Sequence, residues 1–309
     1  MVNLSPKNVA AVAVKTGFIR DTIEKAMRLA DILEYLAESP WKDKLVLKGG
    51  TAINFFYLDL PRLSVDIDLD YIGGTREEVQ KDREMIKDFL TKAMNAKGYF
   101  LNPSSKAHYA LESFVFSFTN SAGNKDNIKV EINYLDRKHI LKTDAHVISN
   151  SVIDGTVAIK VLDMHELFGS KLAALVDRCK PRDLYDTYGL IRSKLKFDTR
   201  LLRKCAVFYN CIGGAADIAA KDFSLLDGIN KTMIAKMLKP VISKTDKFDY
   251  IQAISEVKEY LKGLFSFDIG EIEFIKAFCN REYKPELLFE AADIIARIKE
   301  HPMALWKCQ

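Results

Sequence analysis

The chain has 309 residues, of which 48% are hydrophobic and 28% are charged, a composition that excludes a disordered or fibrous protein. Its formal net charge of +4 is too small to indicate nucleic-acid binding by itself, so such a function must depend on local basic patches. Five cysteines without a CxxC pair exclude a disulfide framework or zinc site, and no segment is long and apolar enough for a signal peptide or membrane span, so we expect a cytoplasmic protein without membrane contact.

The N-terminal part of the sequence predicts helices that alternate with short strands. Ser5 and Pro6 are typical of a helix start, and Thr75 with Glu78 forms a capping-box sequence ahead of a long helix. Apolar periodicity and turn residues set the other boundaries. The expected elements are two helices over 5–38, a strand at 45–47, a glycine turn at 49–50, a short helix at 51–58, a strand at 65–71 and a helix over 75–96.

The remainder predicts one hairpin and then only helices. Gly123 and Asn124 are suited to connect the two strands of that hairpin. The expected elements are strands at 111–118 and 128–134, and helices at 163–178, 181–191, 198–210, 230–238, 246–263, 268–279 and 285–299. This order predicts an α+β domain over residues 1–195 and an all-α domain over residues 196–309.

Three aspartates alternate with apolar residues in the segment RLSVDIDLDYIG. Asp66, Asp68 and Asp70 therefore share one face of the predicted strand. Like charges at this spacing repel one another, which is costly unless a cation neutralises them. Mg²⁺ suits the row because it takes oxygen ligands and leaves room for substrate phosphates. The alternative is an edge strand whose aspartates are merely solvated or discourage sheet pairing.

The upstream segment LVLKGGTAINFF places a strand, a glycine pair and a helix start in succession. Backbone N–H groups at Gly49 and Gly50 can face an anion without a Cβ in the way. A glycine pair alone is usually only a turn. Together with the aspartate row it predicts a phosphate-binding site beside a metal site.

These motifs resemble a known superfamily. Gly49-Gly50 followed by Ser64-x-Asp66-x-Asp68 resembles the signature of the DNA polymerase β-like nucleotidyltransferases. The longer pattern KGGTAINFF…LPRLSVDIDLDY is most similar to their abortive-infection AbiEii/AbiGii toxin branch, to which the MenT toxins belong. Fifteen residues separate Gly50 from Asp66, a longer spacer than in the broad superfamily but one that the toxin branch tolerates.

The resemblance implies a polymerase β-like core, a short mixed sheet flanked by helices, followed by a helical region. It also implies transfer of a nucleoside monophosphate from an NTP with two Mg²⁺ ions held by Asp66 and Asp68. The phosphates would then be held by Gly49, Gly50, Thr51 and Ser64.

A lysine at an inward helix position is the main feature of the segment HELFGSKLAALVDRCKPRDLYDTYGLI. Lys171 shares a helix face with Leu167 and Leu175, so it needs an anionic partner. That partner is either a bound triphosphate or an aspartate of the next helix, in which case the pair only tethers two helices. The resemblance assigns Lys171 and Asp186 to the active site, and Asp183 with less certainty.

Further candidates flank these motifs. Glu131 lies on the polar face of its strand in IKVEINYL, and classical superfamily members take a third metal ligand from such a strand, so Glu131 is either a ligand or a solvated carboxylate. The candidates for RNA contacts are Lys48, Arg62, Arg178, Lys180 and Arg182.

The resemblance implies a toxin that transfers nucleotides onto RNA, with the tRNA 3′ end as the expected acceptor, and that is silenced by a cognate antitoxin. Two other transferases use the same carboxylates: one of the aminoglycoside-modifying kind, which needs an acidic pocket for its cationic substrate, and one that modifies protein. A non-catalytic binding module stabilised by metal is the third alternative.

Overall fold

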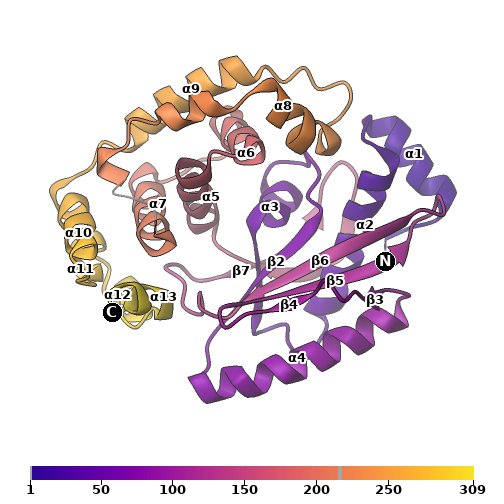
Figure 1. The fold of residues 1–309 in the computed structure, drawn as a ribbon, viewed down its shortest axis with the longest axis horizontal. Coiled ribbons are helices and arrows are strands. Elements are labelled where there is room, and N and C mark those ends of the chain that lie inside the picture. Colours follow the sequence, from indigo (N-terminus) through magenta and orange to yellow (C-terminus); the bar gives the residue numbers. More distant parts are fainter. Residues whose placement is uncertain (1, 215–217) are drawn as a thin grey trace. The chain divides into compact units, whose positions relative to one another are not determined.

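The computed structural model describes residues 2–214 and 218–309, which form two compact units (Figure 1). The first unit comprises Met1–Arg137, Thr143–Val161 and Val241–Lys244. The second comprises Lys138–Lys142, Leu162–Pro240 and Thr245–Gln309. Both units are therefore assembled from segments that are distant in sequence. No helix in the described part of the chain combines the length and the apolarity needed to cross a membrane.

One mixed sheet forms the centre of the first unit. Its strand order is β3-β5-β6-β2-β1-β8-β7, with β4 paired to β5. Strand β2 runs antiparallel to β1 and parallel to β6, so it is an interior strand. This excludes the edge-strand interpretation of the aspartate row. The strands are β1 Leu45–Lys48, β2 Asp66–Tyr71, β3 Phe100–Leu101, β4 Lys106–Ala107, β5 Leu111–Thr119, β6 Lys125–Asn133, β7 Asp144–Ser149 and β8 Asp154–Val161.

Two helices of this unit begin at the caps that the sequence predicts. The Ser5 side chain accepts from the Asn8 N–H at the first helix, and Thr75 and Glu78 form a complete capping box. Apolar side chains from helices and strands build the core, among them Leu29, Ile67 and Val130, all fully buried. The helices are α1 Pro6–Thr16, α2 Arg20–Ala37, α3 Gly49–Ala52, the π-helix η1 Ile53–Tyr57, and α4 Arg76–Ala96.

Helices are the regular elements of the second unit in its described residues, and loops connect them. Helices α5 and α7 approach closely because Gly169 has no side chain: a Cβ there would lie 2.5 Å from the Cβ of Cys205. Phe168 of α5 and Phe208 of α7 are both fully buried, and their rings pack against Phe197 and His301 respectively. The helices are α5 Met164–Arg178, α6 Pro181–Arg192, α7 Thr199–Gly213, η2 Ile218–Ala220, η3 Ser224–Gly228, α8 Lys231–Met233, η4 Ile234–Leu238, η5 Lys239–Val241, α9 Tyr250–Leu264, α10 Ile269–Cys279, α11 Pro285–Leu288, α12 Ala292–Ile298 and α13 Pro302–Lys307.

Two predicted elements need correction, and four strands of the described structure, β3, β4, β7 and β8, were not predicted. Gly49 and Gly50 are not a separate turn but the first residues of α3, because Gly49 enters the helix directly from β1 with φ +72°. The single helix expected over 285–299 is two helices, since the buried Phe289 is extended between them. Strands β7 and β8 were not predicted: β7 is mostly exposed and Ile148 is its one buried residue, so it lacks an alternating apolar face.

Candidate active site

Acidic and basic side chains of two parallel strands lie side by side on the first unit's sheet. In the register of β2 and β6, Asp68 is opposite Glu131 and Asp66 is opposite Lys129. The Lys129 ammonium lies 2.9 Å from the Glu131 carboxylate and 3.9 Å from that of Asp66. The three carboxylates and one lysine thus form a partly exposed group, the carboxylate row, in which Lys129 was not predicted from the sequence.

The charge of Asp68 is poorly tolerated in the protein alone. Burial raises the pKa of Asp68, and the carboxylates of Asp66 and Glu131 raise it further, against the opposing charges of Lys48 and Lys129. A cation bound at the row would relieve this repulsion. The electrostatic part of the sequence argument therefore applies to the folded protein.

The donor set fits a metal that arrives with its substrate. Within residues 2–214 and 218–309, no three histidine, cysteine, aspartate or glutamate side chains are arranged to hold a metal ion by themselves. Mg²⁺ commonly binds through one or two carboxylates together with substrate phosphates. Asp66 and Asp68 meet that requirement, whereas Glu131 is engaged by Lys129.

The two glycines make room for functional side chains. A Cβ on Gly49 would lie 2.3 Å from Oδ2 of Asp68, and one on Gly50 would lie 2.6 Å from Nη2 of Arg62 and 3.3 Å from Oγ of Ser64. Gly49, Gly50 and Ser64 therefore lie together with Asp68, as the sequence predicts. Arg62, predicted as an RNA contact, is 3% exposed and lies within this group.

Thr51 connects the glycines to the aspartate strand. Its hydroxyl donates a hydrogen bond to the backbone carbonyl of Asp66. The Asn54 side chain donates to the carbonyl of Gly50 at 2.8 Å. The first bond holds the start of α3 against β2, and the second is local to α3 and η1, so Thr51 has a positioning role in the described structure.

Lys48 is held by two carboxylates that the sequence did not indicate as its partners. Its ammonium lies 2.5 Å from Oδ1 of Asp70 and 3.3 Å from Oδ2 of Asp136. Burial would lower the pKa of Lys48, but these two charges raise it overall. Asp70 is 1% exposed, so the third aspartate of the motif faces Lys48 rather than an open site. The contact of Lys48 with Asp70 follows from the antiparallel pairing of β1 with β2, which the alternation of residues in the sequence does not reveal.

The second motif forms a buried ion-pair network in the second unit. Lys171 lies 3.0 Å from Asp183 and 3.1 Å from Asp186, and Arg178 makes bonds of 2.7 and 3.0 Å to the two oxygens of Asp183. Burial would raise the pKa of Asp183, but the charges of Lys171 and Arg178 lower it to about 2. Both aspartates that were expected as partners of Lys171 therefore contact it in the structure.

The other two candidates for RNA contacts lie at the start of α6. Lys180 is the exposed N-cap residue, and Arg182 donates from Nε to the carbonyl of Met237 at 2.9 Å. Arg178, Lys180 and Arg182 therefore belong to one helical region of the second unit, whereas Lys48 and Arg62 belong to the first.

The fold is shared with solved nucleotidyltransferases. MenT4, a nucleotidyltransferase toxin from Mycobacterium tuberculosis H37Rv, superposes with a TM-score of 0.71 at 16% sequence identity, over 95% of this chain and 99% of that chain. A protein from H. pylori described as a nucleotidyltransferase superposes with a TM-score of 0.52 at 18% identity, over 80% and 96% of the two chains. The predicted α+β nucleotidyltransferase fold with a helical C-terminal region is confirmed. No curated protein matches the chain by sequence.

The sequence profile of a family described as "Nucleotidyl transferase AbiEii toxin, Type IV TA system" matches residues 31–261. This range is more than half of the chain and includes the carboxylate row, the glycine pair and the Lys171 network. The resemblance inferred from the motifs is confirmed. The chain belongs to the AbiEii family of nucleotidyltransferase toxins of type IV toxin–antitoxin systems.

Proposed function

We propose that this toxin transfers a nucleoside monophosphate from an NTP to an RNA acceptor, and that the acceptor is the 3′ end of a tRNA. The observation that carries the proposal is the carboxylate row beside Gly49, in which Asp68 keeps an unfavourable charge until a cation is bound. Membership of the AbiEii family supplies the reaction class and an antitoxin as partner.

The residues of the first unit are assigned as follows. Asp66 and Asp68 would hold two Mg²⁺ ions, which when bound activate the acceptor hydroxyl and stabilise the departing pyrophosphate. The backbone N–H groups of Gly49 and Gly50 and the Ser64 hydroxyl would donate hydrogen bonds to phosphate oxygens. Thr51 keeps the backbone of Asp66 in place through its hydrogen bond. Glu131 would join the metal ligands if Lys129 releases it.

The chemistry requires an in-line exchange at the α-phosphorus. The acceptor oxygen forms a bond to phosphorus, the bond to pyrophosphate breaks, and the hydroxyl proton is released. In the second unit we propose that Lys171 neutralises phosphate charge and that Asp186 orients its ammonium, with Asp183 in support. The Lys171 ammonium lies 3.0 Å from Asp183 and 3.1 Å from Asp186, so it would have to give up part of these contacts to bind a phosphate.

The proposal is tested by following the label. The purified toxin is incubated with each NTP labelled at the α-phosphate, Mg²⁺ and total RNA, and the products are separated on a gel. We expect labelled tRNA with the wild type and none with Asp66→Asn. A labelled polypeptide, or a labelled aminoglycoside in a parallel reaction, without labelled RNA would replace the RNA proposal by one of the two other transferases.

A further inference from the structure

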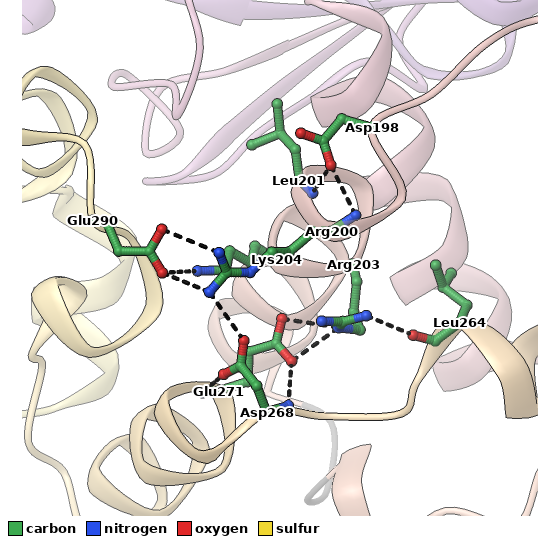
Figure 2. Close-up of polar contacts among 9 residues, drawn as sticks. All are labelled: Asp198, Arg200, Leu201, Arg203, Lys204, Leu264, Asp268, Glu271 and Glu290. Atoms are coloured by element: carbon green, nitrogen blue, oxygen red, sulfur yellow. Dashed lines mark hydrogen bonds and ion pairs between the residues drawn. The ribbon is translucent and has the colours of Figure 1, made fainter.

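Many basic side chains of the second unit are neutralised by the unit's own carboxylates. Figure 2 shows one such group, in which three basic residues of α7 meet three acidic residues: Arg200, Arg203 and Lys204 with Asp268, Glu271 and Glu290. Arg203 lies 2.9 Å from the fully buried Glu271, and Lys204 lies 3.2 Å from Glu290. Such cations must give up a partner before they can bind a phosphate, which makes them poor ligands for RNA.

The same limitation applies to two of the RNA contacts predicted from the sequence. Arg178 uses two of its nitrogens on Asp183, and Lys48 lies between Asp70 and Asp136. Affinity for a polyanion depends on cations that are exposed and not already neutralised. The structure therefore directs attention to another part of the second unit.

Residues 229–240, here called the lysine segment, have three lysines and no aspartate or glutamate. Lys231 lies in α8, Lys236 in η4 and Lys239 in η5, and all three are exposed. Over the described ranges 2–214 and 218–309, none of these three ammonium groups has a carboxylate partner. The segment thus carries three uncompensated positive charges.

The backbone beneath these lysines is fixed. The Asn230 side chain caps α8 by accepting from the Met233 N–H at 3.1 Å, and Ile234 and Leu238 are buried at 4% and 0% exposure. From α6, the Arg182 guanidinium donates to the carbonyl of Met237 at 2.9 Å. Because these contacts hold the backbone in place, binding an anion does not require the segment itself to become ordered.

The length of the lysine segment favours a polyanion over a small anion as its ligand. At a helical rise of about 1.5 Å per residue, the steps from Lys231 to Lys239 extend roughly 12 Å. A nucleic-acid strand offers one phosphate about every 3.4 Å of its axis. The three lysines can therefore meet several phosphates of one strand at once, whereas a single triphosphate would engage only part of the segment. Exposed Lys180, at the start of the same helix α6, adds a fourth charge.

We infer that the lysine segment is the surface through which this toxin binds the phosphate backbone of its RNA acceptor. This inference rests on the proposed function and adds a binding surface to it. Lysine is a flexible point charge that contacts phosphate without reading bases, so the surface contributes affinity rather than sequence preference.

The test compares two triple variants with equal changes in charge. The first is Lys231→Gln with Lys236→Gln and Lys239→Gln. The matched control replaces three exposed lysines elsewhere in the same unit, Lys194→Gln with Lys276→Gln and Lys299→Gln. The dissociation constant for tRNA is measured over a series of salt concentrations, together with NTP binding and the melting temperature.

We expect the first variant to bind tRNA more weakly by on the order of tenfold at low salt. The slope of log affinity against log salt should become shallower by about 0.7 to 0.9 for each phosphate that the protein no longer neutralises. NTP affinity and the melting temperature should stay at wild-type values because the replaced side chains are exposed and unpaired, and the control variant should resemble the wild type in every measurement.

Three outcomes would overturn the inference, and they can be told apart. If the wild type labels RNA but both triple variants bind tRNA alike, the lysine segment is not the binding surface, while the proposed function stands. If the wild type neither labels RNA nor binds it in a salt-dependent way, the proposed function itself fails and the inference fails with it. If the first variant loses binding to vesicles of anionic lipid while it binds tRNA as the wild type does, the inference is also overturned.

Discussion

Asp68 lies where catalytic and folding requirements oppose each other. Its carboxylate packs against the backbone of Gly49 and is opposite Glu131 in the strand register, so two neighbouring carboxylates and partial burial all penalise its charge. Lys48 and Lys129 reduce this penalty but do not remove it. A site of this kind is expected to bind a cation tightly and to be less stable without one.

The first prediction concerns that penalty. Asp68→Asn removes one negative charge and keeps the side-chain volume, so the free energy of unfolding without metal should stay the same or rise by about 1 kcal/mol. Nucleotide transfer should be lost because a metal ligand is missing. Asp144→Asn, an exposed carboxylate of β7, serves as the control and should change neither quantity. Full transfer activity in Asp68→Asn would contradict the metal assignment.

The second prediction concerns Asp183, whose pKa of about 2 lies below its usual value of 3.8. Because the pKa is lower in the folded protein, the ionised group stabilises the fold above about pH 4, and this contribution is lost as the pH falls toward 2. At pH 7, Asp183→Asn should lower the free energy of unfolding by on the order of 2 kcal/mol.

The stability difference should be measured by denaturant unfolding from pH 7 to pH 3. This difference should become smaller as the pH falls, because protonation of Asp183 removes the stabilisation that its ionised form gives the wild type. Asp177→Asn, exposed on the same α5, should show no comparable difference at any pH. A difference in the free energy of unfolding between wild type and Asp183→Asn that stays constant across this range would contradict the prediction. It would mean that the ion pairs of Asp183 with Lys171 and Arg178 do not determine the stability difference.

At the level of elements, the aspartate row could be predicted because alternation along one strand decides which side chains share a face. Its partner Lys129 could not, because the pairing of β2 with β6 joins segments that are distant in sequence. Strand β7 lacks the apolar alternation on which such predictions depend. Strand β8 has it at Val157, Ile159 and Val161, so this strand had a local signal that was missed. The aspartate row was recognised because its pattern is local, whereas its partner on β6 was missed because it depends on tertiary pairing.

The third prediction addresses the start of α3. Gly49→Ala places a Cβ 2.3 Å from the Asp68 carboxylate at a residue with φ +72°, so both sterics and backbone strain oppose it. We expect a loss of roughly 1 to 3 kcal/mol in stability and loss of transfer. Gly263→Ala is the control: it lies inside α9 with no atom within 4 Å of the new Cβ, so it should be tolerated or slightly stabilising. Equal behaviour of the two variants would show that Gly49 is not needed for its conformation.

For the whole molecule, the path of the chain could not be read from local patterns. The division expected at residue 195 follows the order of the predicted elements and remains a prediction about functional domains. The compact units follow contacts instead, and they assign α5 and α6 to the second unit and Val241–Lys244 to the first. A four-residue segment that returns to an earlier unit leaves no periodic signal in the sequence.

The last prediction follows from that path. A fragment of residues 1–195 should not fold cooperatively, for two reasons. It retains α5 without α7, which exposes the surface where Gly169 meets Cys205. It also lacks Val241 and Ile242, which are 2% and 1% exposed in the first unit, where the Val241 carbonyl accepts from the Leu63 N–H at 2.7 Å. Removing two buried aliphatic side chains costs several kcal/mol, comparable to the stability of a domain.

Circular dichroism of the fragment should show a broad thermal transition, and co-expression with residues 196–309 should restore a sharp one. A fragment 1–195 that melts sharply and transfers nucleotides by itself would establish the boundary at residue 195 and show that the returning segment is dispensable.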